Sequence, residues 1–158
     1  MSQHASPFDD LAMPVLLRHA RSAYTAAITS ALAKAGYDDL PKNGTYVIGG
    51  LALQKGGRPL SQLIAELGIS KQAAGQLVDA LVQRRYLKRE VEPEDRRRLT
   101  IALTERGRAA ARVLGTARGA VDAEMVSRAG AKDVERARRV LTALAEIGSE
   151  LNASQDDG

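Results

Sequence analysis

Apolar residues recur at helical spacing through the first part of the chain. From Phe8 to Ala35 they return every three or four positions and cover a wide face, which predicts one long amphipathic helix. Pro14 marks a start or a kink in this helix, and Gly36 ends it. A turn-rich loop then leads to a short helix over Thr45–Gln54. Gly49–Gly50 inside that helix cost roughly 1 kcal/mol each relative to alanine, so a ligand or a close partner helix is expected to need the space.

A glycine turn joins two short amphipathic segments in the middle of the chain. Leu63 and Leu67 stand one helical turn apart, and Gly68 follows them as a helix-ending residue. Ser70 can then cap a further helix with its side-chain oxygen. The apolar stripe of that helix is Ala74, Leu77, Val78 and Leu81. This arrangement predicts a helix-turn-helix, with a plain helical hairpin as the alternative.

Apolar and polar residues alternate on both sides of a polar segment that contains a proline, Glu92–Arg97. The residues that share a face are Leu87, Arg89 and Val91 before this segment and Leu99, Ile101 and Leu103 after it. Such alternation predicts the two strands of a hairpin. A helix-turn-helix that continues directly into a hairpin is a winged helix, and the polar segment is then the tip of the wing.

Two long amphipathic helices are predicted after the hairpin. Thr104 can cap the first, whose apolar stripe extends to Met125, and the second presents an apolar face over Val134–Leu151. Together with the first helix, they carry more apolar surface than one small winged helix can cover. The two ends of the chain are therefore expected to pack on each other and on a second copy, with a helically capped monomer as the alternative.

Composition narrows the classes of function. The 158 residues contain no cysteine and two histidines, which excludes disulfides, thiol chemistry and cysteine- or histidine-rich metal sites. No phosphate loop, HExxH motif or Ser/His/Asp cluster is present, so neither an enzyme nor a cofactor is expected. No apolar run approaches the ~20 residues of a membrane span, and the N-terminus lacks the order of a signal peptide. A cytoplasmic protein with no membrane partner is expected.

The positive charge is concentrated rather than spread. A net charge of +4 permits an acidic partner without proving one. Seven basic residues, however, crowd into the end of the helix-turn-helix and the hairpin: Arg84, Arg85, Lys88, Arg89, Arg96, Arg97 and Arg98. Basic clustering on one element is typical of nucleic-acid binding proteins, and a solvated face is the alternative. A basic wing tip beside a basic helix favours nucleic-acid binding.

The segment EDRRRLTIALTERG resembles the wing signature of the MarR family of bacterial transcription regulators. Asp95 is followed two positions later by Arg97, an alternating strand ends at Thr104, and Gly107 follows. The order of predicted elements fits the family from about residue 11 to residue 151. The sequence departs from the family pattern at Arg85–Tyr86, where a glycine usually precedes the first wing strand, and residues 41–57 match poorly.

The resemblance implies a mainly α fold with a small β-hairpin wing, that is, a winged helix-turn-helix with N- and C-terminal dimerisation helices. The expected parts are an N-terminal dimerisation helix (1–40), a winged helix-turn-helix DNA-binding lobe (41–104) and C-terminal dimerisation helices (105–158). The implied protein is a homodimeric repressor that binds a pseudo-palindromic operator in double-stranded DNA and is released by a small, aromatic or phenolic ligand. Two alternatives are an architectural DNA-binding protein with little sequence preference and a winged helix used only for protein contacts.

Docking of the second motif helix in the major groove would bring its N-terminal residues to the base edges. The predicted contacts there are Ser70, Lys71, Gln72, Ala73 and Gln76, with Ser61 and Gln62 of the preceding helix on phosphates. In the wing, Arg97 is expected in the minor groove, Arg96 and Arg98 on phosphates, and Asp95 as a brace of the loop. For an effector the sequence offers His19, Tyr24 and Tyr46, for which packing is the stronger interpretation.

Overall fold

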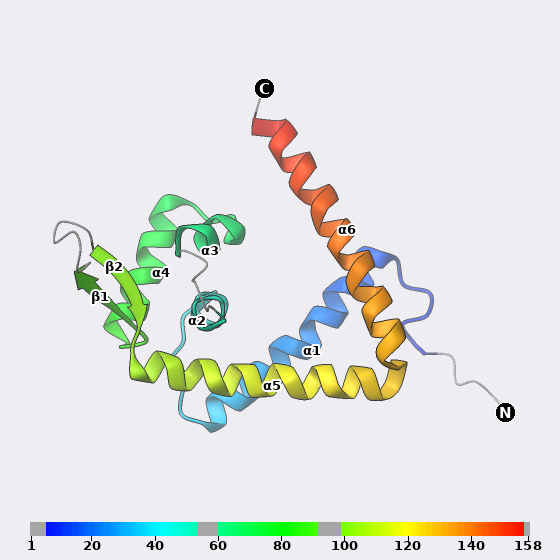
Figure 1. Cartoon of the computed structure of the whole chain (residues 1–158), viewed down its shortest axis with the longest axis horizontal. Helices are drawn as coiled ribbons and strands as arrows, with labels where there is room; N and C mark the ends of the chain where they lie inside the picture. The colour runs from blue at the N-terminus through cyan, green and yellow to red at the C-terminus, as the bar shows by residue number, and fades with distance from the viewer. Residues whose placement is uncertain (1–5, 54–59, 92–98, 157–158) are drawn as a thin grey trace. The chain divides into compact units, whose positions relative to one another are not determined.

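The computed structural model describes residues 6–53, 60–91 and 99–156 of the chain (Figure 1). Within these ranges, six helices and one antiparallel pair of strands follow in the order α1 to α4, β1, β2, α5 and α6. The mainly helical fold class with a single β-hairpin is confirmed. The chain divides into two compact units, residues 1–118 and 119–158, and the division falls inside α5.

The first helix, α1, spans Met13–Lys34 and is shorter than the predicted helix over Phe8–Ala35. Pro14 lies in its first turn, where the missing backbone N–H costs nothing, and this sets the start of the helix. The apolar spacing continues upstream, but residues 6–9 form a separate turn held by local hydrogen bonds. Gly36, at φ +80°, reverses the chain after α1 as predicted.

Helices α2 (Gly44–Ala52) and α3 (Leu60–Leu67) cross closely at a glycine. A Cβ on Gly50 would lie 2.5 Å from Cδ2 of the buried Leu63, closer than two non-bonded carbon atoms can approach. Of the two occupants expected from the sequence, ligand or partner helix, the partner helix α3 therefore fills the space beside Gly50.

The helix-turn-helix is completed by α4, which spans Lys71–Gln83. Gly68 at φ +59° makes the turn, and the hydroxyl of Ser70 caps α4 by accepting a backbone hydrogen bond of 3.2 Å. At the other end, Arg85 adopts φ +61°, and the N–H of Tyr86 donates back to the last turn of α4. Arg85 thus takes the left-handed conformation that glycine usually supplies before the wing, at a cost of roughly 1–2 kcal/mol.

Strands β1 (Leu87–Val91) and β2 (Leu99–Leu103) form the predicted hairpin, and they pair antiparallel with Leu87 opposite Leu103. Leu87 is 1% exposed, whereas Val91 near the far end of the same strand is 52% exposed. Only the base of the hairpin is therefore anchored in the core, and its outer half projects into solvent.

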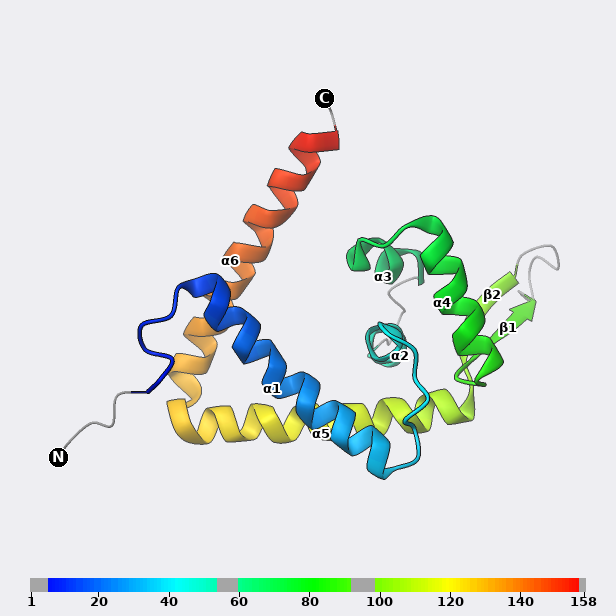
Figure 2. The same ribbon diagram turned by 180° about the vertical axis from the view of Figure 1, so that it is seen from behind.

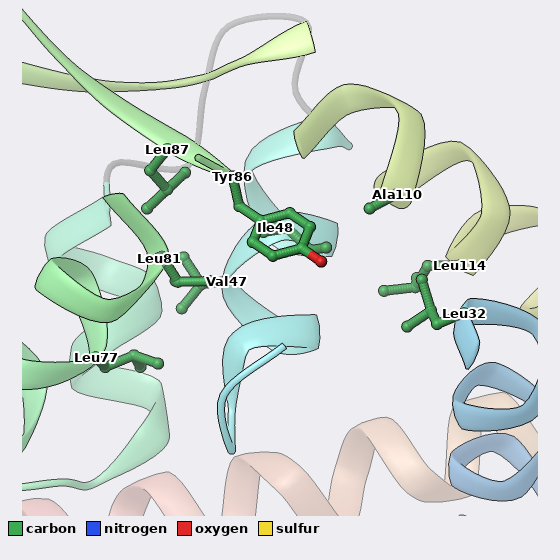
Figure 3. Close-up of a cluster of buried hydrophobic side chains, with 9 residues drawn as sticks. All are labelled: Leu32, Val47, Ile48, Leu77, Leu81, Tyr86, Leu87, Ala110 and Leu114. Atoms are coloured by element: carbon green, nitrogen blue, oxygen red, sulfur yellow. The ribbon is translucent and has the colours of Figure 1, made fainter. Parts of the chain in front are cut away.

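One hydrophobic core holds the first unit together. It consists of Leu32, Val47, Ile48, Leu77, Leu81, Tyr86, Leu87, Ala110 and Leu114, drawn in Figure 3. These residues come from α1, α2, α4, the start of the wing and α5 (Glu105–Ala129). Tyr86, the largest of the fully buried side chains, is the only aromatic residue in this cluster.

The second unit contains α6, which spans Ala131–Asp156 and follows Gly130 at φ +82°. A row of large apolar side chains on α6 is exposed in the single chain: Val140, Leu141, Leu144, Ile147 and Leu151 are 43–63% exposed. Despite its length, neither α6 nor any other helix in the described ranges is apolar enough to cross a membrane.

Candidate nucleic-acid interface

Helix α4 has one apolar face in the core and one polar face in solvent. The solvent face includes Lys71, Gln72, Gly75, Gln76 and Asp79. Of the predicted base contacts, Lys71, Gln72 and Gln76 therefore lie exposed on one side of the helix. Ala73 is half-buried at the edge of this face, and the hydroxyl of Ser70 is engaged in capping. The arrangement leaves two amide side chains and one ammonium group available to an external partner.

Gly75 lies near the centre of this polar face. A Cβ built on it would meet no atom within 4 Å, so packing inside the described chain does not require glycine here. Glycine in a helix is less stable than alanine by roughly 0.5–1 kcal/mol. The residue leaves the backbone of α4 uncovered by a side chain at this point of the face.

The start of α3 presents the two predicted phosphate contacts. Ser61 and Gln62 are both exposed in its first turn, where backbone N–H groups lack helical partners. The side-chain amide of Gln62 donates to Glu66 Oε1 (3.2 Å), and the hydroxyl of Tyr46 donates to the other oxygen of the same carboxylate. Gln62 is therefore partly engaged within the protein, and Tyr46 links α2 to α3.

The predicted wing-tip residues, Asp95, Arg96, Arg97 and Arg98, lie outside the described residues. At the described base of the wing, Arg89 of β1 forms an ion pair with Asp79 of α4, and Lys88 pairs with Glu90. Exposed pairs of this kind contribute at most about 1 kcal/mol. The Arg89–Asp79 pair nevertheless connects the wing to the polar face of α4.

A buried tyrosine joins three distant segments at the base of the wing. The hydroxyl of Tyr86 donates to Asp39 Oδ1, and Arg106 Nη2 donates to the same oxygen (2.9 Å) and to the tyrosine hydroxyl (3.0 Å). The Arg106 guanidinium also lies 4.7 Å from the Tyr86 ring centroid and 5.6 Å from that of Tyr37. The connection from α1 to α2 passes the start of α5 at this point (Figure 2).

The ionisation of this cluster follows from its contacts. The hydrogen bond from Tyr86, with the nearby positive charge of Arg106, holds the pKa of Asp39 below its ordinary value. Burial raises the pKa of the Tyr86 hydroxyl, and its hydrogen bond to the Asp39 carboxylate raises it further. Asp39 is therefore charged and Tyr86 neutral throughout the neutral pH range, so the cluster holds the wing in place without titrating there.

Two residues of the wing signature, Thr104 and Gly107, have a structural role at the start of α5. The N–H of Gly107 donates to the hydroxyl of Thr104 (3.0 Å), which caps α5, and that hydroxyl donates to the carbonyl of Tyr86 (3.1 Å). A Cβ on Gly107 would lie 2.1 Å from this same carbonyl oxygen. The first turn of α5 thus lies directly against the backbone that begins the wing.

A cavity of about 470 Å³ opens between α2, the end of β2 and α5. Its apolar lining includes Leu51, Leu53, Leu103 and Leu114, and three arginines of α5, Arg108, Arg112 and Arg118, also line it. This volume is typical of small-molecule sites.

The effector residues predicted from sequence do not line this cavity. His19 is exposed on α1, with its ring 5.5 Å from that of Phe8, and Tyr24 is half-buried further along the same helix. Tyr46 forms its hydrogen bond on the α3 side of α2. An effector role for these three residues stays a prediction.

Sequence interpretation missed the cluster around Tyr86. Its hydrogen-bond partners, Asp39 and Arg106, are 47 and 20 residues away from it along the chain. No periodicity or spacing connects residues so far apart. The one local signal was the unusual Arg85–Tyr86 pair before the wing.

Residues 39–98, from the end of the α1–α2 connection to the wing, match the model of the MarR family. The structure is similar to that of S. aureus MepR in its complex with DNA, with 18% identity, a TM-score of 0.68, and coverage of 87% of this chain and 98% of that one. It also resembles the transcriptional repressor CouR bound to a 23-mer DNA duplex, with 20% identity, a TM-score of 0.65, and coverage of 91% and 99%. A comparison with curated proteins gave no match.

A third similar structure is the transcriptional regulator PA4135, with 20% identity, a TM-score of 0.62, and coverage of 87% of this chain and 98% of that one. At these identities the structures establish the winged-helix fold, and the family match covers the segment that contains α2, α3, α4 and β1. Residues 39–98 thus match the MarR family, and the likeness of the whole chain to the solved structures is one of fold.

Proposed function

We propose that the protein is a sequence-specific, double-stranded-DNA-binding transcriptional repressor that acts as a homodimer. The observation that carries this proposal is the solvent face of α4, on which Lys71, Gln72 and Gln76 stand exposed beside a glycine. Amide side chains can hydrogen-bond adenine through two atoms, and an ammonium group can donate to guanine. MepR and CouR, which have the same fold, have been solved with DNA.

The remaining contacts hold α4 in register. Ser61, exposed at the start of α3, and the arginines at the wing tip are proposed to meet the sugar-phosphate backbone. Arg97 is proposed to enter the minor groove, with Asp95 as the brace of its loop. The wing is attached to the rest of the lobe through the Tyr86 cluster, so the tip arginines act from a fixed base.

The exposed apolar row on α6 supports a homodimer. Side chains as large as Leu141 and Leu144, exposed together on one helix, are a typical feature of an interaction surface. A symmetric dimer would present two copies of α4, which matches a pseudo-palindromic operator.

DNA binding is tested with the purified protein on two duplexes, one from the promoter of its own gene and one of random sequence. We expect the promoter duplex to bind at least roughly 10³-fold more tightly at physiological salt. Fluorescence anisotropy over a salt titration measures both affinities. Equal affinities would favour an architectural protein, and no binding to either duplex would favour a winged helix used for protein contacts.

Substitutions on α4 separate base contacts from backbone contacts. Gln72→Ala and Gln76→Ala should each relax the base preference at particular operator positions by about 1–3 kcal/mol. The same change at an exposed glutamine at the end of α4, Gln83→Ala, should leave the preference unchanged. A loss of affinity that is equal for every DNA sequence would assign Gln72 and Gln76 to the backbone instead.

The cavity beside α5 supports the second part of the proposal, release from DNA by a small ligand. Its leucines provide an apolar lining, and the guanidinium groups of Arg108, Arg112 and Arg118 favour a negative charge on the ligand. Arg108 also donates to the carbonyl of Leu103 at the end of the wing (2.7 Å). A ligand bound to Arg108 would therefore contact a residue that holds the wing.

Aromatic carboxylates are the first probes for this site. Benzoate and 4-hydroxybenzoate are expected to raise the melting temperature, since a ligand at 100 times its Kd stabilises a protein by about 2.7 kcal/mol. Benzamide, which lacks the charge, should act weakly. Arg112→Ala should remove the shift, whereas Arg138→Ala on α6 should not. An equal shift in the Arg112→Ala variant would place the ligand elsewhere.

A further inference from the structure

We infer that the connection between α1 and α2 is a phosphate-binding edge of the DNA interface, with Lys42 and Asn43 as its contacts. The inference rests on the proposed DNA binding and adds residues that neither the sequence pattern nor the wing signature indicated. Three observations support it. The segment and α4 line one groove, other basic residues are paired inside the protein, and the side chains of Lys42 and Asn43 are not paired with any described residue.

The groove lies between α4 and the end of the α1–α2 connection. Its volume is about 270 Å³, and it is lined from one side by Pro41, Lys42 and Asn43. From the other side it is lined by α4, including Ala73 and Gln76, which are two of the predicted base contacts. The segment that carries Lys42 therefore stands directly beside the part of α4 that is proposed to read bases.

The width of the DNA major groove indicates which part of the DNA this neighbouring segment would contact. A helix with its side chains is about 10–12 Å across, and the major groove of B-DNA is about 12 Å wide. A helix in the groove thus fills it, and elements that flank the helix come against the sugar-phosphate strands on either side. The apolar wall formed by Ala73, Leu77 and Ala80 suits a deoxyribose, and Lys42 suits its phosphate.

Several basic residues near the wing already have partners inside the protein. Arg84 donates to the carbonyl of Asp39 (2.6 Å), Arg89 pairs with Asp79, and Lys88 pairs with Glu90. The cluster that suggested DNA binding in the sequence is therefore partly neutralised in the fold. A cation beside α4 that has no such partner can contact a phosphate without giving up an interaction inside the protein.

Lys42 and Asn43 have side chains that the described part of the chain does not use. Lys42 is exposed and makes no ion pair with a described residue. Asn43 occupies the N-cap of α2 at φ +67°, yet its side chain accepts no capping hydrogen bond, although asparagine at this position commonly does. The ammonium and the amide are thus both free to donate to phosphate oxygens.

Lys42→Ala tests the assignment in the full-length protein. Removal of one ionic interaction with a phosphate should flatten the slope of log affinity against log salt by about 0.9, and by about twice that in a symmetric dimer. Affinity should fall by the same factor for promoter and random duplexes, and the melting temperature should not change. Lys132→Ala, which removes the same charge at the start of α6, should keep the wild-type slope.

Asn43→Gly is the second variant, because glycine keeps the left-handed backbone while it removes the side chain. A decrease of about threefold to tenfold in affinity on both duplexes is expected. A wild-type slope in Lys42→Ala, or a decrease confined to one operator sequence, would overturn the phosphate assignment while the proposed DNA binding stands. A wild-type protein that binds neither duplex would overturn both.

Discussion

Gly107→Ala is expected to destabilise the protein by about 3 kcal/mol or more. The added Cβ would lie 2.1 Å from the carbonyl oxygen of Tyr86, a backbone atom that cannot rotate away as a side chain can. Overpacking against side chains commonly costs about 1–3 kcal/mol. Relief here requires that α5 and the start of β1 move apart, which would also break the hydrogen bonds from Thr104 to the carbonyl of Tyr86 that join them.

Urea unfolding at a fixed protein concentration measures this effect, with Gly115→Ala as the matched control on the same helix. A Cβ on Gly115 would meet nothing within 4 Å in the described chain, so alanine there should stabilise α5 by roughly 0.5–1 kcal/mol. If the two variants unfold at the same urea concentration, the close approach of α5 to the wing does not exist in solution. DNA affinity of Gly107→Ala should fall as well, because the wing loses its fixed base.

Leu141→Glu combined with Leu144→Glu is expected to abolish the dimer at micromolar concentration. Both leucines belong to the exposed apolar row of α6, and burying a leucine contributes about 1.5–3 kcal/mol relative to leaving it exposed. The substitutions remove that contribution and would bury unpaired carboxylates, which costs several kcal/mol more. Light scattering coupled to size-exclusion chromatography reports the mass directly.

The control for this double variant is Thr142→Glu, which adds a carboxylate to another exposed position of α6 outside the apolar row. It should leave the dimer intact. A monomeric double variant should also lose most of its operator affinity while it retains the helical content of the wild type. A stable, folded dimer after both leucine substitutions would place the interface elsewhere on the chain.

The amino-acid sequence by itself determined the order of the elements and most of their ends. Gly36 and Gly68 end helices, and Ser70 and Thr104 begin them, through hydrogen bonds or backbone angles that involve residues a few positions away. The residues that share a face of each strand followed from alternation, because successive side chains of a strand point to opposite faces. The start of α1 was placed too early because apolar spacing alone does not show where backbone hydrogen bonding begins.

The contacts that support the candidate interface were decided by the tertiary structure. Asp39 and Arg106 are 67 residues apart, and both reach Tyr86 only because α1, α4 and α5 share one core. The crossing at Gly50 and the approach at Gly107 are likewise distances between elements. Lys42 resembles any loop lysine in the sequence, and its place beside Gln76 exists only once α2 packs against the helix-turn-helix. Local patterns arise from neighbours along the chain, whereas these contacts arise from packing, which leaves no periodic signal in the sequence.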